Sequence, residues 1–193
     1  MLLQHTLIGV LATQLAAAAV AAPPLPQAAA FLPPVPPRDW QTIVLHHSAT
    51  EGGNIDSIDS VHRQQKDSAG NPWLGIGYHF VVGNGRATGN QSMGDGEVQP
   101  TFRWQQQLAG AHAGRREQNE QGIGICLIGN FEQAAPTDKQ LASLTALLKT
   151  LSGRYAISPA RLLRHQDVHA TLCPGRLFPW KQVVDGLVSD EGT

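Results

Sequence analysis

The segment from Arg164 to Gly175 constrains the fold of this chain most, because it gathers imidazole and thiol side chains in a protein with only two cysteines. It contains His165, His169 and Cys173. Neutral imidazole and thiolate are the donors that zinc prefers in a tetrahedral site. Two donors from this segment and one from elsewhere leave a fourth position for water, which is typical of a catalytic zinc site. The fold must then bring a distant part of the chain to this segment.

A further donor is available far upstream. Residues 41–45 form an apolar, β-branched run that predicts a buried strand, and His46 and His47 end it. Neighbouring side chains on a strand point to opposite faces, so only one of them can enter a given site. In the late segment the donors are spaced four apart, but eight residues of α-helix span about 12 Å, too far for ligands of one ion. We predict a loop that folds back there, with one of its two histidines as ligand. The residues alone leave the choice within each histidine pair open.

The two cysteines have different surroundings in the sequence. Cys126 lies in the apolar run Ile123–Ile128, where it is typical of a small buried core residue. Cys173 has histidines at metal-binding spacing. A disulfide between the two is the alternative for an exported chain, and it would abolish the zinc site. We predict that both cysteines are unpaired.

The N-terminal region is typical of an exported protein. Residues 1–22 are mostly apolar and end in small residues, as in a secretory signal peptide cut near Ala22. A transmembrane anchor is the alternative, but the apolar run is short and interrupted for a span of about 20 residues. Residues 23–38 are rich in proline and alanine and predict an extended linker without its own core. We therefore expect a periplasmic or extracellular protein with no stable membrane anchor.

The remainder of the chain is long enough for one domain with a single core. We place this domain at residues 39–185 and a tail at residues 186–193. The formal net charge is −1 and no basic run is present. Phosphate binding relies on clustered Lys and Arg, so we expect no nucleic-acid partner. We expect a monomer.

Hydrophobic periodicity predicts the elements of the first half. Residues 54–65 form an amphipathic helix, and residues 66–72 are a polar loop. Residues 77–82 form a strand, which after a glycine-rich turn returns as a hairpin partner at residues 86–89. Residues 91–107 are polar and remain unassigned.

In the second half, strands and helices continue to alternate. Residues 122–128 are continuously apolar, as in a strand buried on both sides. Thr137 opens a helix with Gln140 in a capping box, and Gly153 ends it. A last short helix follows Pro179. This alternation predicts an α/β domain, with a sheet covered by helices.

Five segments together resemble a zinc amidase family that includes the phage lysozyme-type N-acetylmuramoyl-L-alanine amidases and the animal peptidoglycan recognition proteins. They occur in the order that the family has, over residues 41–180. The segments are Val44–Thr50, Gly75–Phe80, Gly110–Ala113, Asn119 with Ile123–Gly129, and His165–Pro174. The resemblance implies a single domain with a central mixed β-sheet covered by helices, like that of the peptidoglycan recognition proteins.

The resemblance also implies the residues of a site. One Zn²⁺ would be bound by His46, His165 and Cys173, and Tyr78 matches the catalytic tyrosine of the family. Thr171 stands where phage members carry an essential lysine and where the recognition proteins often carry threonine. A hydroxyl brings no charge to that position.

Three further residues fall where family members line the groove that holds the muramyl peptide. They are His62, His112 and Asn119. The loop at residues 66–72 and the stretch 97–107 look longer than the family pattern, so the shape of the groove does not transfer.

The same residues also have structural interpretations. Tyr78 on an apolar strand fits a core aromatic whose hydroxyl is satisfied, and His62 fits a core histidine on its helix face. His169 fits a solvated or loop-stabilising residue as well as a substrate contact. We expect His47 and His79 to be structural. Asp167 could support a ligand imidazole or form a local turn.

The resemblance implies hydrolysis of the amide between N-acetylmuramic acid and L-alanine, with peptidoglycan or muramyl peptides as partners. A binding module of the same fold, without hydrolysis, is the alternative. Cys173 argues against it, because non-hydrolytic members of the family typically lack that thiol. A zinc amidase acting on another acyl amide is a third interpretation.

Overall fold

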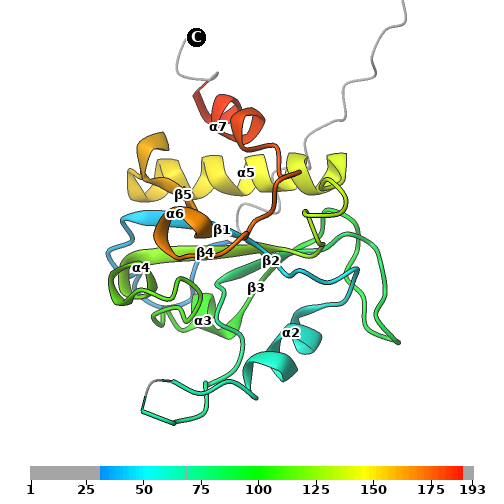
Figure 1. Cartoon of the computed structure of the whole chain (residues 1–193). Coiled ribbons are helices and arrows are strands. Elements are labelled where there is room, and N and C mark those ends of the chain that lie inside the picture. The colour runs from blue at the N-terminus through cyan, green and yellow to red at the C-terminus, as the bar shows by residue number, and fades with distance from the viewer. Residues whose placement is uncertain (1–30, 68, 189–193) are drawn as a thin grey trace, which may run out of the picture.

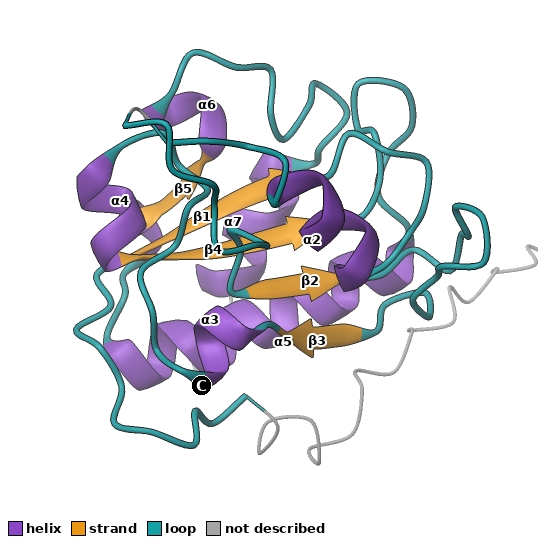
Figure 2. Cartoon of the chain, turned by 90° about the horizontal axis from the view of Figure 1, so that it is seen from below, coloured by secondary structure: helices purple, strands orange, loops and turns teal. Residues whose placement is uncertain are grey.

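The computed structural model describes residues 31–67 and 69–188 of the chain (Figure 1). One mixed sheet has the strand order β3-β2-β4-β1-β5. Its strands are β1 (Thr42–His47), β2 (Phe80–Val82), β3 (Val98–Pro100), β4 (Gly122–Leu127) and β5 (Leu162–Arg164). Strands β2, β4, β1 and β5 are mutually parallel, and β3 runs antiparallel to β2 (Figure 2). The predicted α/β fold with a central mixed sheet is confirmed.

Helices lie on both faces of this sheet (Figure 1). They are α2 (Ile55–His62), α3 (Phe102–Gln105), α4 (Arg116–Gln121), α5 (Asp138–Tyr155), α6 (His165–Val168), α7 (Trp180–Val188) and the 3₁₀ turn η1 (Pro159–Arg161). Leucines of α5 and Val183 of α7 pack in one core cluster with β1, β2 and β4. Ile58 of α2 packs in a second cluster with Val81 and Cys126 on the opposite face. The sheet is therefore buried on both sides, which explains its continuous apolar strands.

The core begins earlier than the predicted domain start at residue 39. Phe31 is only 4% exposed, and its ring lies 5.8 Å from the ring of Phe80. Its carbonyl oxygen accepts a hydrogen bond from the indole nitrogen of Trp104 at 3.0 Å. The end of the proline-rich segment therefore contributes to the core. The predicted signal peptide lies outside the described residues. Within the part of the chain that the structure describes, no helix has the length and hydropathy needed to span a bilayer.

The predicted hairpin partner of β2 is wrong. β2 pairs with β3 at residues 98–100, inside the stretch that remained unassigned, and not with residues 86–89. After β2 the chain makes a wide excursion, closed at its base by hydrogen bonds between Gly83 and the segment Gly96–Glu97. Thr88 and Gln91 form only an isolated bridge within it. The glycine-rich turn after β2 is therefore followed by a second turn, and the strand that pairs with β2 lies about ten residues later in the chain than predicted.

The predicted capping box of α5 is confirmed, but the predicted end at Gly153 is wrong. Gly153 has open space around it and the helix passes through to Tyr155. Ala156 then ends the helix in the left-handed conformation, with φ of 51°. An exposed glycine inside a long amphipathic helix costs about 1 kcal/mol, which the buried leucine face of α5 offsets.

Gln140 links the start of α5 to the ends of two strands. Its amide nitrogen donates to the carbonyl oxygens of Val82 at 3.2 Å and Ile128 at 2.9 Å, and its side chain is only 1% exposed. Replacing Gln140 with methionine keeps the size and removes both this donor and the side-chain oxygen that accepts from the amide of Thr137 in the capping box. We expect this change to lower the free energy of unfolding by about 1–3 kcal/mol in urea titrations. The exposed Gln182→Met variant is the control, and equal stability of the two variants would contradict this role.

Candidate metal centre and groove

Two parallel strands deliver the predicted histidine donors to the same edge of the sheet. His46 lies near the carboxyl end of β1, and His165 follows directly after the end of the neighbouring strand β5. The carboxyl ends of parallel strands meet at one edge, which is where such sheets commonly place their sites. The rings of the two histidines lie 4.5 Å apart, centroid to centroid.

The segment after His165 folds back, as predicted. α6 makes a single turn, and the amide of Gln166 then donates to the carbonyl oxygen of Cys173 at 2.9 Å. The hydroxyl oxygen of Thr171 accepts from the amide of Cys173 at 3.2 Å. These bonds turn the Cys173 thiol toward β1, where its Sγ lies 3.8 Å from Nδ1 of His46.

The donor atoms of His46, His165 and Cys173 fit a zinc ion. They all lie within 4.8 Å of one another. Donors around a tetrahedral zinc lie roughly 3.3–3.6 Å apart, so small side-chain movements would close the set. Nε2 of His165 is buried without a hydrogen-bond partner. Buried polar atoms normally have a partner, and a metal ion would supply one here. Both cysteines are free, so the alternative disulfide is absent among the described residues.

The other members of the histidine pairs lie outside this cluster. His47 turns to the opposite face, where its Nδ1 accepts from the amide of Phe131 at 3.1 Å. His169 is exposed and stacks on His165, with 5.6 Å between the ring centroids. His79 is also bonded within the fold, to the amide of Gly124 and the carbonyl oxygen of Leu108. Asp167 pairs with the Arg164 side chain and accepts from its amide, which makes it part of the local turn.

Burial sets the protonation of the metal-free donors. It lowers the pKa of His46 well below its ordinary value, with further lowering by His112 and His165 nearby. Burial, helped by His169, lowers the pKa of His165 to about 4. Burial raises the pKa of the Cys173 thiol to about 12. Near neutral pH the cluster therefore holds two neutral imidazoles and one protonated thiol.

These pKa values predict how many protons leave when zinc binds. At pH 7.5 the imidazoles are already neutral, so only the Cys173 thiol must lose a proton, and we expect about one proton released per zinc. As the pH falls toward about 4, His165 becomes protonated and the number should rise. Calorimetric titration in buffers of different ionisation enthalpy measures this number. Release of no proton at pH 7.5 would show that the thiol is already ionised without metal.

Tyr78 lies beside the donor cluster. The centroid of its ring is 5.0 Å from that of His46 and 5.3 Å from that of His62. Burial raises its pKa well above the ordinary value, with further contributions from Cys126 and Cys173. The phenol therefore stays protonated as a hydrogen-bond donor, and in the metal-free protein the Cys126 side chain is its partner.

A groove of about 840 Å³ leads to the cluster, and His165 lies at its lining. One wall is formed by residues 66–67 and 72–74, and the other by residues 109–120. The buried guanidinium of Arg103 ties the walls together, because it donates to the carbonyl oxygens of Ile76 and Ala109. The sequence does not reveal this role of Arg103, because it depends on the carbonyl oxygen of Ile76, which lies 27 residues earlier in the chain.

The predicted groove residues occupy different places. His112 and Asn119 line the groove. Nδ1 of His62 accepts from the amide of Gly77 at 2.9 Å, and its ring packs edge-on against Trp73 of the groove wall, with 5.4 Å between centroids. The Asn119 side chain accepts from the amides of His112 and Ala113, both at 2.9 Å.

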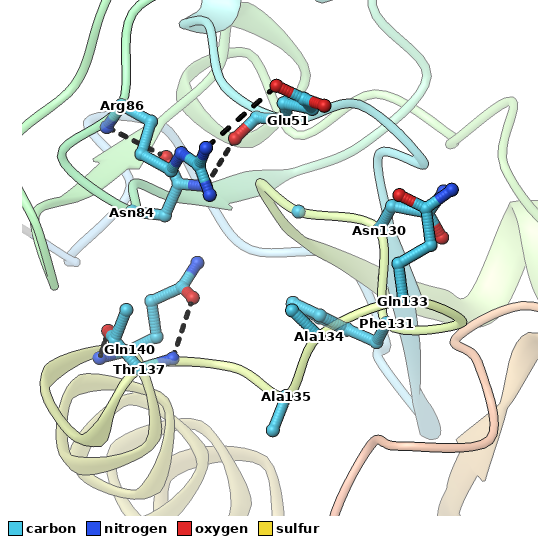
Figure 3. A pocket seen from close by; sticks show the side chains of 11 residues that line it. Glu51, Asn84, Arg86, Asn130, Phe131, Gln133, Ala134, Ala135, Thr137 and Gln140 are labelled. Carbon is cyan, nitrogen blue, oxygen red and sulfur yellow. Dashed lines mark hydrogen bonds and ion pairs between the residues drawn. The ribbon is translucent and has the colours of Figure 1, made fainter.

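A second, smaller pocket of about 130 Å³ lies between loops that follow β1, β2 and β4 (Figure 3). Its cation, Arg86, already faces the Glu51 carboxylate at 3.8 Å. None of the three metal donors lines it. The larger groove, which His165 lines, is therefore the candidate site.

Comparison with known proteins identifies the family of this chain. A family model described as N-acetylmuramoyl-L-alanine amidase (Amidase_2) matches residues 36–176. Peptidoglycan-recognition protein SC2 of Drosophila melanogaster is 31% identical over 146 residues, which are 72% of this chain and 70% of that protein. An N-acetylmuramoyl-L-alanine amidase of Homo sapiens is 31% identical over 121 residues, 62% of this chain and 18% of that protein. The solved structure of N-acetylmuramoyl-L-alanine amidase LysC from Clostridium intestinale URNW has 31% identity and a TM-score of 0.63, covering 80% of this chain and 91% of that one.

The fold and the site define an α/β protein with an open groove, and His165 of a cluster that could hold a metal ion lines this groove. The chain belongs to the Amidase_2 family of N-acetylmuramoyl-L-alanine amidases, as the sequence resemblance predicted. Its relatives include proteins named for peptidoglycan recognition and proteins named for amide hydrolysis. The choice between these two functions therefore rests on the residues of the site.

Proposed function

We propose that this protein is a zinc-dependent amidase that cleaves the bond between N-acetylmuramic acid and L-alanine in peptidoglycan. The observation that carries the proposal is the convergence of His46, His165 and Cys173 in one cluster, whose His165 lines the groove. Three protein donors leave one position of a tetrahedral zinc open, as a catalytic site requires. Bound zinc would supply Lewis-acid polarisation of the scissile carbonyl and an activated water.

Tyr78 has a defined task in this proposal. A thiolate donor leaves the metal centre less positive than three imidazoles would, so a hydrogen-bond donor to the developing oxyanion is useful. The Tyr78 phenol is protonated and lies beside the cluster. We assign it this hydrogen bond, or the positioning of the attacking water.

Thr171 would contribute a second hydrogen bond. Its oxygen accepts from the amide of Cys173, which leaves the hydroxyl hydrogen free to donate. The bond to the Cys173 amide keeps this hydroxyl in the loop that carries the thiol donor. Thr171 therefore combines support of the Cys173 loop with a neutral donor toward the reacting carbonyl.

The groove supplies the room for a muramyl peptide. Its volume of about 840 Å³ is within the range of small-molecule binding sites. Asn119 lines this groove, and we propose that His62 supports its wall by packing against Trp73. Peptidoglycan lies outside the cytoplasm, so the proposal also requires export, which the predicted signal peptide at residues 1–22 would provide.

Digestion of purified peptidoglycan sacculi tests this function. The products are identified by mass after incubation with the protein, with and without a chelator. We expect free stem peptides that begin at L-alanine, lost with the chelator and restored by zinc. Binding to sacculi without new amines would support the alternative of a recognition module, and cuts elsewhere in the glycan or peptide would contradict the assignment.

A further inference from the structure

His112 joins one of the metal donors to the backbone of the sheet. Its Nδ1 lies 3.0 Å from Nε2 of His46, and its Nε2 lies 3.2 Å from the carbonyl oxygen of Gly122. A carbonyl oxygen can only accept a hydrogen bond, so the proton of the neutral His112 ring sits on Nε2. Its Nδ1 is then an acceptor that faces His46.

The same reasoning fixes the proton of His46. A ring that offers Nδ1 to a metal must carry its own proton on Nε2. That proton points at the accepting Nδ1 of His112. The unprotonated Nδ1 of His46 then faces Sγ of Cys173, 3.8 Å away. With the proton of each ring on Nε2, His46 donates to His112 and His112 donates to Gly122, so the nitrogens of both rings have partners.

The fold holds the His112 ring in a slot built from glycines. A Cβ atom at Gly124 would lie 2.5 Å from Cδ2 of His112, and one at Gly110 would lie 2.3 Å from the same atom. Both distances are too short for any real contact, so neither position accepts even a methyl group while the ring stays in place. The ring is 6% exposed. It therefore has one orientation available.

Asn119 fixes the backbone that carries this ring. Its side-chain oxygen accepts from the amides of His112 and Ala113. Both ring nitrogens of His112 are already engaged, by His46 and Gly122, so neither is free to bind a muramyl peptide.

We propose that His112 is a positioning residue of the metal centre, which fixes the tautomer and the orientation of His46 so that its Nδ1 faces the ion. The inference rests on the metal site of the proposed function. It gives His112 a role other than the substrate contact expected from its place in the sequence. Residues that orient a metal ligand in this way typically contribute about 10–100-fold to metal affinity.

Zinc affinity, measured by competition with a chromophoric chelator, tests this role in two variants. His112→Leu removes the acceptor, and we expect zinc to bind about 10–100-fold more weakly. His112→Asn keeps an acceptor near the place of Nδ1, and we expect it to recover part of that loss. Circular dichroism establishes that each variant is folded. A folded leucine variant that binds zinc as tightly as the unchanged protein would overturn the proposal.

Nitrogen-15 spectroscopy of the histidines in the unchanged, metal-free protein gives a test that needs no variant. We expect both His46 and His112 to carry their proton on Nε2. A proton on Nδ1 of His112 would overturn the proposal. If the unchanged protein takes up no zinc, the proposed function fails, whereas the tautomers still decide the hydrogen-bond chain independently.

Discussion

Replacing Cys173 with alanine is expected to remove bound zinc and to reduce amide hydrolysis to the level of the zinc-free protein. The thiol is one of three donors in the cluster, and its loss leaves only two imidazoles. Loss of a residue that merely orients a ligand weakens metal binding about 10–100-fold, so loss of a donor should exceed that range. Elemental analysis after dialysis against a weak chelator gives the zinc content, and the release of stem peptides from sacculi gives the rate.

The second cysteine provides a matched control for this change. Cys126 is fully buried on β4, in register with His46 across the sheet. We expect Cys126→Ala to cost about 1 kcal/mol of stability through lost packing, with stoichiometric zinc retained. Stoichiometric zinc in the Cys173 variant would show that the assigned donor is wrong.

Replacing Tyr78 with phenylalanine is expected to slow turnover by roughly 10²–10³-fold while zinc stays bound. The change removes one hydroxyl and keeps the ring against His46 and His62. If the hydroxyl acts mainly on the transition state, kcat should fall and KM should change little. Steady-state rates on a soluble muramyl peptide, together with zinc content, measure both.

The other tyrosine of the chain gives the comparison. Tyr155 lies at the end of α5, where its ring packs edge-on against Trp104 and its hydroxyl accepts from Arg154. We expect Tyr155→Phe to leave turnover unchanged. Full activity of the Tyr78 variant would remove Tyr78 from the mechanism, and loss of its zinc would give it a structural role.

Long elements could be predicted from the sequence because their signals add up over many residues. Helix α5, which Thr137 caps, and the apolar strands β1 and β4 are of this kind. β3 and β5 have three residues each, too few for any periodicity to appear. Their pairing depends on contacts with distant strands, which a local pattern does not contain.

The choice between His46 and His47 illustrates the limit at the site. Both faces of β1 are covered, so all six of its residues are buried and no alternation marks the face that holds the groove. Only the resemblance to the amidase family separated the two histidines. The role of His112 was hidden for a similar reason, although a glycine within a buried strand, here Gly124, commonly marks the close approach of a neighbouring group.

X-ray absorption at the zinc edge tests the central claim most directly, when made on the zinc-loaded Cys126→Ala variant, in which Cys173 is the only thiol. We expect one sulfur at about 2.3 Å and lighter ligands at about 2.0–2.1 Å, in a four-coordinate shell. A shell of nitrogen and oxygen alone would contradict the account, because it would place the metal away from Cys173.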